Sequence, residues 1–462
     1  MKLDELIGKR VHFIGLGGAG MSGIARIMLA RGISISGSDA KDSGVLAGLK
    51  TLGAEVFVGH QASNLGSANV LVISSAIDGN NPELLAARAS GLLILSRAEA
   101  LALLMSESKS VAVAGTHGKT TTTSMLTVAL QQAGLDPSFA IGGMINRGGT
   151  NAHLGSGDIF IAEADESDGS FLAYKPFGAI ITNIELDHVD HFPDIESVNR
   201  IFLDFVASIQ SGGFLVAGID SPGVVHLLSQ IVRTDIQIIT YGESADMAIS
   251  HISLQPSQAH ARITKLGKVL GELSLSIPGK HNIENATAAF AVGLALGAPG
   301  AELLAGLSNF SGAKRRFENK GSVNGITVID DYGHHPTEVR VTLETAKRFA
   351  GNGQVIVIFQ PHRFSRTAMF VSEFAQVLDI ADQIYLLEVY AASEAAIPGV
   401  SSILIANAMA SAKVQFEPSM IDVVNSAVEF AKPGDVIITL GAGDVNLLVP
   451  IILQTLEEKI AN

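Results

Sequence analysis

The sequence predicts an α/β protein with three domains, and three observations support this fold class. Short apolar runs typical of buried strands alternate with segments typical of helices. Two of these runs end in a glycine-rich turn that opens a helix, as in nucleotide-binding βα units. The chain has 462 residues, 47% of them hydrophobic. That is enough for about two to four separately folded domains.

The composition excludes several classes of protein. There is no cysteine, so disulfides and thiolate metal sites are ruled out. No run of ~18 or more apolar residues is present, and the acidic N-terminus does not resemble a signal peptide, so we expect no membrane insertion and a cytoplasmic location. The net charge of -14 argues against a nucleic-acid binder. Glycine-rich loops and a few arginines can still bind small anions.

The first unit has the pattern of a βαβ nucleotide-binding fold. A strand is expected over residues 10–15, a helix over 21–31 and a second strand over 33–37. After the first strand comes a G-x-G-x-x-G motif, Gly15-Leu16-Gly17-Gly18-Ala19-Gly20, and Asp39 follows about 20 positions later. The loop is expected to bind the pyrophosphate of NAD or of another nucleotide diphosphate. A glycine-rich turn without a ligand is the plainer alternative.

The domain boundaries are predicted from linkers and changes of pattern. Further strands are expected over residues 70–75 and 92–95, and Arg97 opens a short helix before the linker at 107–109. A basic cluster near residue 314 opens the last unit. The predicted domains therefore span residues 1–107, 108–312 and 313–462.

The second unit begins with a phosphate-binding motif. A buried strand is expected over residues 111–114 and a helix over 120–132, and between them lies Gly115-Thr116-His117-Gly118-Lys119-Thr120-Thr121. Loop N–H groups and the helix dipole favour an anion there. Lys119 would reach the terminal phosphates and the Thr120 hydroxyl would bind Mg²⁺. Val113 stands where the full Walker motif has glycine, and a strand–turn–helix with an exposed lysine is the plainer alternative.

Acidic and histidine side chains follow the next two strands of this unit. The strand over residues 159–162 leads into Glu163-Ala164-Asp165-Glu166-Ser167-Asp168, and the strand over 179–182 leads into a segment that contains His188. Carboxylates at the ends of strands beside a phosphate loop are typical of a Mg²⁺ site. An exposed acidic turn is the alternative for the first segment, and a surface histidine for the second.

Two other segments of this unit are candidates for ligand contacts. The glycine- and asparagine-rich stretch over residues 142–151 either binds a polar substrate or is a mobile loop. Strand-like runs between residues 213 and 277 indicate a sheet-rich half. They are followed by the start of a helix that contains His281, Asn282 and Asn285. These residues either cap the helix or contact the edge of a nucleotide base.

The third unit repeats the strand-end pattern. Strands are expected over residues 327–329, 355–359 and 436–440, and each is followed by polar residues, as at the ligand edge of open α/β sheets. Arg363 and Arg366, three apart at a helix start, can both face an anionic substrate. A solvated basic turn is the alternative.

These motifs together resemble those of the Mur ligases, in the same order and over essentially the whole chain. The loop from Gly115 resembles the shortened phosphate loop of that family, so Val113 is expected. The resemblance also rests on the segments 163–168, Asn183 with Asp187-His188, His281-Asn282 with Asn285-Ala286, Arg315-Arg316-Phe317, 330–336 and 360–367. It is closest to the member that adds L-alanine to UDP-N-acetylmuramate. The related ligase that recycles murein peptides is the nearest alternative.

The resemblance implies a fold and a reaction. It implies a Rossmann-like N-terminal domain for the UDP-sugar, a central P-loop domain for ATP and a Rossmann-like C-terminal domain for the amino acid. With ATP and Mg²⁺, L-alanine would be joined to the lactyl carboxylate of UDP-N-acetylmuramate through an acyl phosphate, in peptidoglycan precursor synthesis. The oligomeric state stays open between a monomer and a homodimer.

The resemblance also implies roles for individual residues. Lys119, His188, His335, Arg363 and Arg366 form the expected catalytic set, and Thr120, Glu163 and His188 the expected Mg²⁺ ligands. The other expected ATP contacts are Gly115, Thr116, Gly118, Thr121, His281, Asn282, Asn285, Arg316 and Asp331. The expected UDP-sugar contacts are Gly15, Gly17, Gly18, Gly20, Asp39, Ser75, Arg97 and Asn151. His335, Arg363 and Arg366 are expected to bind the carboxylates of the amino acid and the muramyl group.

One departure and two rival interpretations qualify this picture. Several Mur ligases carry a carbamylated lysine after the motif containing His188, but this chain has no lysine between Lys175 and Lys265. A second Mg²⁺ must therefore be held differently, which fits the alanine-adding branch. A nicotinamide oxidoreductase is the first rival, and the presence of two phosphate loops counts against it. A nucleotide-binding regulator without turnover is the second.

Overall fold

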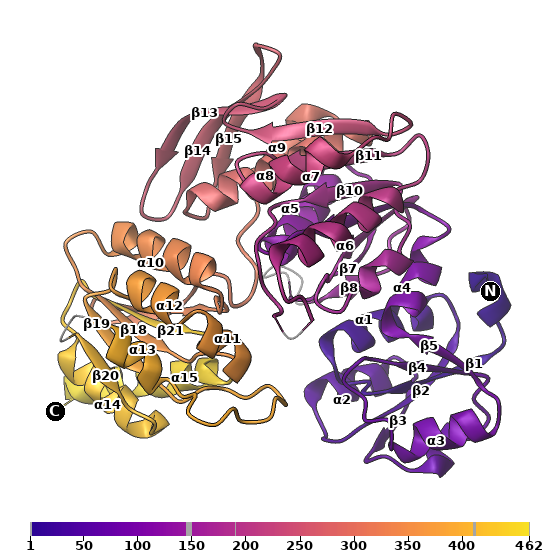
Figure 1. The fold of residues 1–462 in the computed structure, drawn as a ribbon, viewed down its shortest axis with the longest axis horizontal. Helices are drawn as coiled ribbons and strands as arrows, with labels where there is room; N and C mark the ends of the chain where they lie inside the picture. The colour runs from indigo at the N-terminus through magenta and orange to yellow at the C-terminus, as the bar shows by residue number, and fades with distance from the viewer. Residues whose placement is uncertain (1, 145–149, 190, 410–412, 462) are drawn as a thin grey trace.

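The computed structural model describes residues 2–144, 150–189, 191–409 and 413–461. Three sheets, each with helices packed against it, form three lobes that follow one another along the chain (Figure 1). In this view the N-terminal lobe lies at the lower right, the central lobe at the top and the C-terminal lobe at the lower left. The predicted three-domain α/β fold class is confirmed. In the described ranges, no helix is both long and apolar enough to cross a bilayer.

The N-terminal sheet has five parallel strands in the order β3-β2-β1-β4-β5. This is the strand order of a Rossmann fold up to its fifth strand, in which β1 and β4 flank the point where the order reverses. The glycine-rich loop follows β1 and therefore opens into the crevice at that point. The elements are η1 (Leu3–Leu6), β1 (Arg10–Ile14), α1 (Ala19–Ala30), β2 (Ser34–Asp39), α2 (Gly44–Thr51), β3 (Glu55–Val58), η2 (Ala62–Leu65), β4 (Val70–Ile73), α3 (Pro82–Ala89), β5 (Leu93–Ser96) and α4 (Arg97–Met105).

The central sheet has ten strands in the order β15-β14-β13-β12-β11-β10-β6-β9-β7-β8. The strands from β12 to β7 in this order are parallel, so helices cover both faces. The elements are β6 (Lys109–Ala114), α5 (Lys119–Gln132), β7 (Ser138–Ala140), β8 (Ala152–His153), β9 (Ile159–Glu163), η3 (Ser170–Ala173), β10 (Gly178–Ile181), α6 (Ile195–Ala207), β11 (Phe214–Gly218), α7 (Pro222–Gln230), β12 (Gln237–Gly242), β13 (Met247–Leu254), β14 (Ala259–Lys265), β15 (Lys268–Leu275), α8 (Lys280–Ala295) and α9 (Gly300–Ser308).

The sheet-rich half of the central domain contains a strand that the sequence pattern did not predict. Strands β13, β14 and β15 form an antiparallel extension of the sheet, and β13 was missed. The first residues of β13 alternate between buried and half-buried, because this strand, which lies between β12 and β14, is packed against the core on one face only. It therefore lacks the continuous apolar run by which the parallel strands were found.

The C-terminal sheet has six strands in the order β16-β17-β21-β18-β19-β20, and only β16 is antiparallel to its neighbour. The three predicted strands are β17, β18 and β21, which lie side by side at its centre. The elements are β16 (Glu318–Val323), β17 (Ile326–Asp331), α10 (Pro336–Ala350), β18 (Val355–Phe359), α11 (Phe364–Met369), α12 (Val371–Leu378), β19 (Gln383–Leu386), α13 (Ile403–Ala408), β20 (Val414–Phe416), α14 (Met420–Phe430), β21 (Val436–Leu440), η4 (Val445–Leu447) and α15 (Leu448–Ala461).

The hydrophobic cores show how the domains are joined. One buried cluster runs from N-terminal residues such as Met28 and Leu104 to central residues such as Phe171 and Phe202. The C-terminal domain has two clusters of its own, one on each face of its sheet. The N-terminal and central domains therefore share apolar packing, whereas the contacts described below that join the central and C-terminal domains are polar.

Candidate active site

The phosphate loop lies between the end of β6 and the start of α5, and β9 and β10 flank β6 in the sheet. Gly115 has φ +126° and Gly118 has φ +84°, in the region that residues with a Cβ rarely adopt. A Cβ on Gly115 would overlap the Thr182 side chain, and one on Gly118 would come within 2.7 Å of Asn285 Oδ1. Gly118 is also the N-cap of α5 and has no side chain to cap it. The first N–H groups of α5 can therefore bind an anion.

Lys119 is held over the loop by three acceptors. Its Nζ donates to the carbonyl oxygens of Gly115 (2.7 Å) and Thr116 (3.1 Å) and pairs with Glu166 at 2.9 Å. Burial by itself lowers the pKa of Lys119, but the charges of Glu166 and Asp165 outweigh burial and raise it. The alternative of an exposed lysine does not describe this loop, since the side chain is 14% exposed.

Thr120 and Glu163, two of the Mg²⁺ ligands expected from the sequence, are in direct contact. The Thr120 hydroxyl donates to Glu163 Oε1 at 2.8 Å, and the Gly142 N–H donates to Glu163 Oε2 at 2.8 Å. A hydroxyl and a carboxylate side by side next to a phosphate loop fit Mg²⁺, which takes one or two carboxylates together with phosphate oxygens and waters.

His188 is the other predicted metal ligand. It lies close to Glu166, the carboxylate that pairs with Lys119. His188 Nε2 is 3.9 Å from Glu166 Oε1 and 3.8 Å from Asp187 Oδ2. Burial raises the pKa of Glu166 to about 7, although Lys119 acts in the opposite direction. Because Glu166 is 3% exposed, the alternative of an exposed acidic turn does not describe this part of the segment. The sequence had singled out Glu163 and not Glu166.

A cluster of four side chains, here called the junction cluster, joins the phosphate loop to the C-terminal domain: His117, Glu185, His335 and Glu338. His117 Nδ1 lies 3.3 Å from Glu338 Oε1, and His117 Nε2 lies 3.5 Å from Glu185 Oε2. Burial lowers the pKa of His117, but the two nearby carboxylates outweigh burial and raise the pKa to about 9. His335, at the N-cap of α10, is 4.7 Å from His117 between ring centroids.

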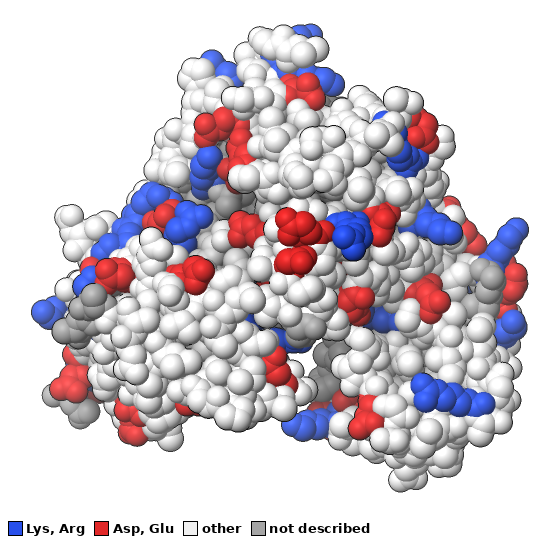
Figure 2. Space-filling model, in the orientation of Figure 1, with Lys and Arg blue, Asp and Glu red and all other residues white. Residues whose placement is uncertain are grey.

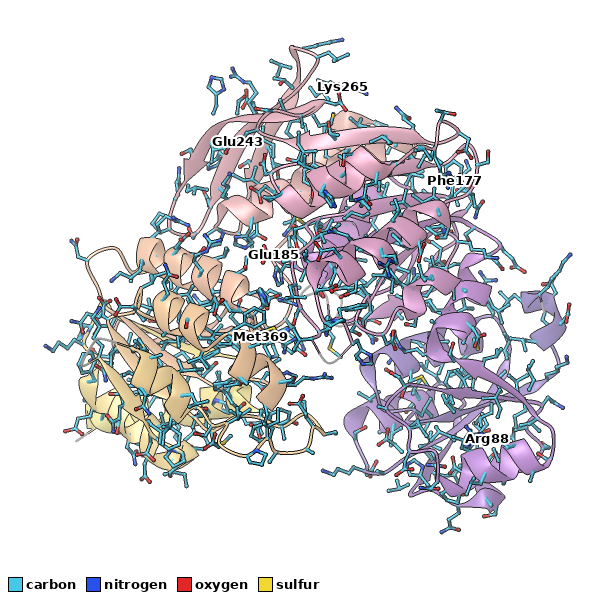
Figure 3. All side chains as sticks on the ribbon, in the orientation of Figure 1. Arg88, Phe177, Glu185, Glu243, Lys265 and Met369 are labelled. Atoms are coloured by element: carbon cyan, nitrogen blue, oxygen red, sulfur yellow. The ribbon has the colours of Figure 1, made fainter. Side chains whose placement is uncertain are left out.

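Figure 3 labels side chains on both sides of this junction. Glu185 follows β10 on the side of the central domain that faces the C-terminal lobe, and Met369 lies on α11 across from it. His335 Nε2 reaches the Leu186 carbonyl at 3.2 Å, and the Thr337 hydroxyl donates to Glu185 at 2.6 Å. The segment after β10 is therefore a docking edge for the start of α10.

Most of the predicted ATP contacts line one cavity of about 370 Å³ between the central and C-terminal domains. Asn282 donates to the Pro278 carbonyl at 2.6 Å, and no side chain caps the helix at Gly279. Simple N-capping therefore does not account for this helix start. Burial, with Arg348 and Arg316 nearby, lowers the pKa of His281 to about 4. The predicted residues that line the cavity are Gly118, Thr121, His281, Asn282, Asn285, Arg316 and Asp331.

Two of these residues from the C-terminal domain have protein partners as well. Arg316 lies 3.5 Å from Glu338 and stacks over Tyr332 at 5.2 Å. Asp331 accepts hydrogen bonds from the N–H groups of Phe317 (2.7 Å) and Gly333 (2.8 Å). Asp331 therefore also shapes the end of β17.

The two predicted arginines differ in their surroundings. Arg366 is 4% exposed, and its Nε and Nη2 donate to Asp187 Oδ1 at 3.0 and 2.7 Å. Burial raises the pKa of Asp187, but Arg366 outweighs it and holds that pKa well below its ordinary value. Arg363 precedes α11 with φ +71°, and its N–H donates to the Tyr390 carbonyl. The solvated basic turn is therefore excluded for Arg366, which pairs across the junction.

A second cavity, of about 360 Å³, lies between the glycine-rich loop of the N-terminal domain and the central domain. Asn151 donates to the Ala19 carbonyl at 2.7 Å, and Arg97 lies 3.8 Å from Asp165. Both contacts join these two domains. Residues 145–149, in the predicted polar loop, lie outside the described residues. The predicted substrate residues lining the cavity are Gly15, Gly18, Gly20, Ser75, Arg97 and Asn151, together with Glu163.

Asp39, one of the expected UDP-sugar contacts, is bonded to the glycine-rich loop. Its Oδ2 accepts a hydrogen bond from the Gly17 N–H at 2.9 Å, and a Cβ on Gly17 would come equally close to that oxygen. Asp39 thus holds the glycine-rich loop against the end of β2.

The contacts across the junction were not predicted from sequence. Glu185 and Glu338, which both lie close to His117, are more than 150 positions apart along the chain. No local sequence pattern predicts that they meet. The sequence offered one indication of Glu185: it follows a predicted buried strand, and the end of that strand was expected to lie at the site. On the face shown in Figure 2, acidic and basic side chains are interspersed and form no continuous basic patch, as the net charge suggested.

Three sequence profiles match consecutive parts of the chain. They are described as Mur ligase family, catalytic domain (residues 10–109), Mur ligase middle domain (113–293) and Mur ligase, glutamate ligase domain (315–443). The chain is 51% identical over 447 residues to UDP-N-acetylmuramate–L-alanine ligase of Renibacterium salmoninarum, covering 97% of this chain and 96% of the relative. It is 48% identical over 455 residues to the ligase of the same name from Acidothermus cellulolyticus, covering 97% and 95%.

Solved structures agree with these matches. The UDP-N-acetylmuramate–alanine ligase MurC from Thermotoga maritima superimposes with a TM-score of 0.82 at 29% identity, covering 98% of this chain and 100% of that one. A murein peptide ligase from Psychrobacter arcticus superimposes with a TM-score of 0.72 at 27% identity, covering 97% and 99%. The three profiles lie in the order of the three observed domains, and the chain belongs to the Mur ligase family.

Proposed function

We propose that this chain is an ATP-dependent ligase that joins L-alanine to the lactyl carboxylate of UDP-N-acetylmuramate in peptidoglycan precursor synthesis. The observation that carries the proposal is the presence of two cavities beside the phosphate loop and its partner Glu163. One is lined by Gly118, Thr121 and other predicted ATP contacts, and the other by the predicted UDP-sugar contacts and Glu163. Thr120, which precedes Thr121 in the loop, bonds to Glu163 of the second cavity. The names of the relatives at 51% and 48% identity support this choice of substrates.

We assign one substrate to each domain. Residues 1–107 would bind the UDP-sugar, residues 108–312 ATP and residues 313–462 the amino acid. The ATP cavity is lined from both the central and the C-terminal domain, so binding of ATP would favour the docked arrangement. We place the reaction in the cytoplasm, where ATP is available.

The chemistry needs activation because a carboxylate is a poor acylating agent. A lactyl carboxylate oxygen attacks the γ-phosphorus of ATP, ADP leaves, and an acyl phosphate forms. The amine of L-alanine then attacks the acyl carbonyl, and collapse of the tetrahedral intermediate releases phosphate. Lys119 would leave Glu166 for the transferring phosphoryl group and stabilise its charge. Mg²⁺ held by Thr120 and Glu163 would neutralise the phosphate oxygens, and we assign His188 to a second ion.

The remaining charged residues would position the two carboxylates. Arg366 already binds a carboxylate in this structure, that of Asp187, through two nitrogens. A substrate carboxylate would replace Asp187 at this fork, and Arg363 and His335 from the same domain would complete its binding.

Phosphate release from ATP tests the proposal, with UDP-N-acetylmuramate and L-alanine each present or omitted. We expect release only when both are present, because the acyl phosphate needs an amine to turn over. Release without either substrate would identify a plain ATPase and contradict the proposal. Release with a murein tripeptide but not with L-alanine would instead identify the recycling ligase. No release with any acceptor, alongside ATP binding, would favour the regulator.

A further inference from the structure

Three atoms of the junction cluster converge on one point between the central and C-terminal domains. His117, Glu185 and His335 each offer one ligand atom, and these three atoms lie within 4.8 Å of one another. Glu185 Oε2 is 3.5 Å from His117 Nε2 and 3.9 Å from His335 Nδ1. Ligand atoms of a tetrahedral metal centre with bonds of about 2.0–2.2 Å are roughly 3.3–3.6 Å apart, so a small contraction suffices.

The outer nitrogen of each imidazole already has an acceptor. His335 Nε2 lies 3.2 Å from the Leu186 carbonyl, and His117 Nδ1 lies 3.3 Å from Glu338 Oε1. When these outer nitrogens carry the protons, His335 Nδ1 and His117 Nε2 each present a lone pair to the centre of the cluster. Histidines that bind metals are usually oriented in this way, by a carbonyl or carboxylate on the far nitrogen.

The inner atoms have weak or no competing partners. His117 Nε2 is buried and has no hydrogen-bond partner. His335 Nδ1 accepts a long bond of 3.3 Å from the Thr337 N–H, which again requires a lone pair on that nitrogen. Glu185 Oε2 accepts from the Thr337 hydroxyl at 2.6 Å, a bond that orients the carboxylate and that a ligating oxygen can keep.

We propose that His117, Glu185 and His335 form a site for a divalent cation of the zinc class, distinct from the Mg²⁺ position at Thr120 and Glu163. Two imidazole nitrogens and one carboxylate oxygen are a donor set that Zn²⁺ binds with a water as fourth ligand. Mg²⁺ prefers oxygen ligands alone and dehydrates reluctantly, so it would not compete well here. Binding releases the proton that His117 shares with the two carboxylates.

The position of the ligands gives the site a mechanical consequence. His117 belongs to the phosphate loop, Glu185 follows β10, and His335 precedes α10 of the C-terminal domain. A bound Zn²⁺ would therefore tie the phosphate loop to the C-terminal domain and engage His335. It would hold the two domains docked without ATP, and this consequence does not depend on which amino acid the ligase uses.

Calorimetric titration of the full chain with Zn²⁺, in excess Mg²⁺ and without nucleotide, tests the site. We expect one equivalent of Zn²⁺ per chain. Glu185→Gln should remove a ligand and weaken binding at least tenfold. Glu338→Gln, which changes the carboxylate that faces His117 Nδ1 and also its pair with Arg316, should weaken binding about 10–100-fold. His153→Asn is the matched control, since His153 pairs with Asp136 at 3.3 Å far from the junction.

The outcomes separate this site from the Mg²⁺ position. Zinc binding that survives Glu185→Gln and Glu338→Gln but is lost in Glu163→Gln would place Zn²⁺ at the Mg²⁺ position and overturn the proposal. Absence of Zn²⁺ binding to the unchanged chain would overturn it as well. If a variant fails to fold by circular dichroism, anomalous diffraction at the zinc edge from the unchanged protein decides instead. A peak between residues 117, 185 and 335 supports the site, and a peak elsewhere contradicts it.

Discussion

At the scale of single residues, the phosphate loop combines two glycines at positive φ with a buried, paired lysine. Gly115 and Gly118 turn the chain so that the first N–H groups of α5 carry no side-chain cap. Lys119 folds back on the loop carbonyls and on Glu166. Because these contacts are local or lie at neighbouring strand ends, single substitutions can test them separately.

Gly115→Ala is expected to destabilise the central domain by at least about 2–3 kcal/mol, because the new Cβ meets Thr182 at an unfavourable φ. Urea unfolding measures the loss, and nucleotide binding should weaken with it. Gly134→Ala is the matched control. Gly134 has φ +76° but nothing within 4 Å of its Cβ position, so only about 1 kcal/mol is expected. Equal losses in the two variants would show that the contact with Thr182 does not matter.

Lys119→Ala is expected to lower turnover by about 100-fold or more, because it removes a preorganised cation from the transferring phosphoryl group. Binding of UDP-N-acetylmuramate, measured by calorimetry, should stay unchanged. Lys109→Ala serves as a control, since Lys109 is on the preceding strand with its side chain 61% exposed. Parallel loss of turnover and of UDP-sugar binding would mean that the two cavities are not independent.

At the scale of secondary-structure elements, a buried carboxylate ties two strands and a helix of the N-terminal domain together. Glu83, at the start of α3, accepts from Ser38 of β2 at 2.6 Å and lies 3.2 Å from His12 of β1. Its second oxygen accepts from Asn64 at 2.7 Å. Asp39, the neighbour of Ser38, accepts a hydrogen bond from the glycine-rich loop. The network around Glu83 therefore stabilises the end of β2 that holds this loop.

Glu83→Gln is expected to destabilise β1 and β2 by about 1–3 kcal/mol, because an amide cannot satisfy all these donors. Burial raises the pKa of Glu83, but bonds from His12, Ser38 and Asn64 outweigh it, so the folded pKa lies below the ordinary 4.5. This stabilisation is therefore complete above the unfolded pKa and lost as the pH falls through the folded one. Hydrogen exchange of β1 and β2 amides measures the effect.

The Glu83 variant should lose this acid dependence, because it has no carboxylate to protonate. Glu55→Gln, which breaks an exposed pair with Arg10 on the same sheet, should cost less than about 1 kcal/mol. A Glu83→Gln protein with unchanged exchange at neutral pH would show that the network is dispensable.

At the scale of the whole molecule, the two domain interfaces differ in kind. The N-terminal and central domains share one apolar cluster, which resists separation in water. The contacts to the C-terminal domain described above, among the described residues, include charge pairs and hydrogen bonds, and Asp187–Arg366 is the most buried of these pairs. The C-terminal domain is therefore the one that substrates can release or hold.

Asp187→Asn is expected to undock the C-terminal domain in the ligand-free protein. Removing one partner of a buried pair costs about 3–5 kcal/mol, since Arg366 is left with an unpaired buried charge. Small-angle scattering should report a larger radius of gyration. Asp382→Asn is the control, because its pair with Lys347 lies within the C-terminal domain. An unchanged radius for both variants would mean that other contacts hold the docked arrangement.

The candidate site was predictable where it depends on local sequence. Lys119, Thr120 and the acidic segment 163–168 were identified because a phosphate loop and the ends of adjacent parallel strands must meet at one edge of a sheet, and the family resemblance singled out Glu163 within that segment. Glu166 and Glu185 were not singled out, since their partners depend on how a loop folds and how a separate domain docks. Strand β13 was missed for a related reason, because its burial depends on α8 and the neighbouring strands that pack against one of its faces.

By itself, the sequence determined the α/β fold class, because apolar periodicity and glycine-rich turns act over a few residues. The order of its motifs, through their resemblance to those of the Mur ligases, indicated the family. Only the tertiary structure decided the junction. In the folded chain, Arg366 pairs with Asp187, and His117 and His335 lie around Glu185. The Gly17 N–H donates a hydrogen bond to Asp39. The physical reason is that charges and imidazoles act over a few ångströms in space, and the packing of separate domains sets those distances.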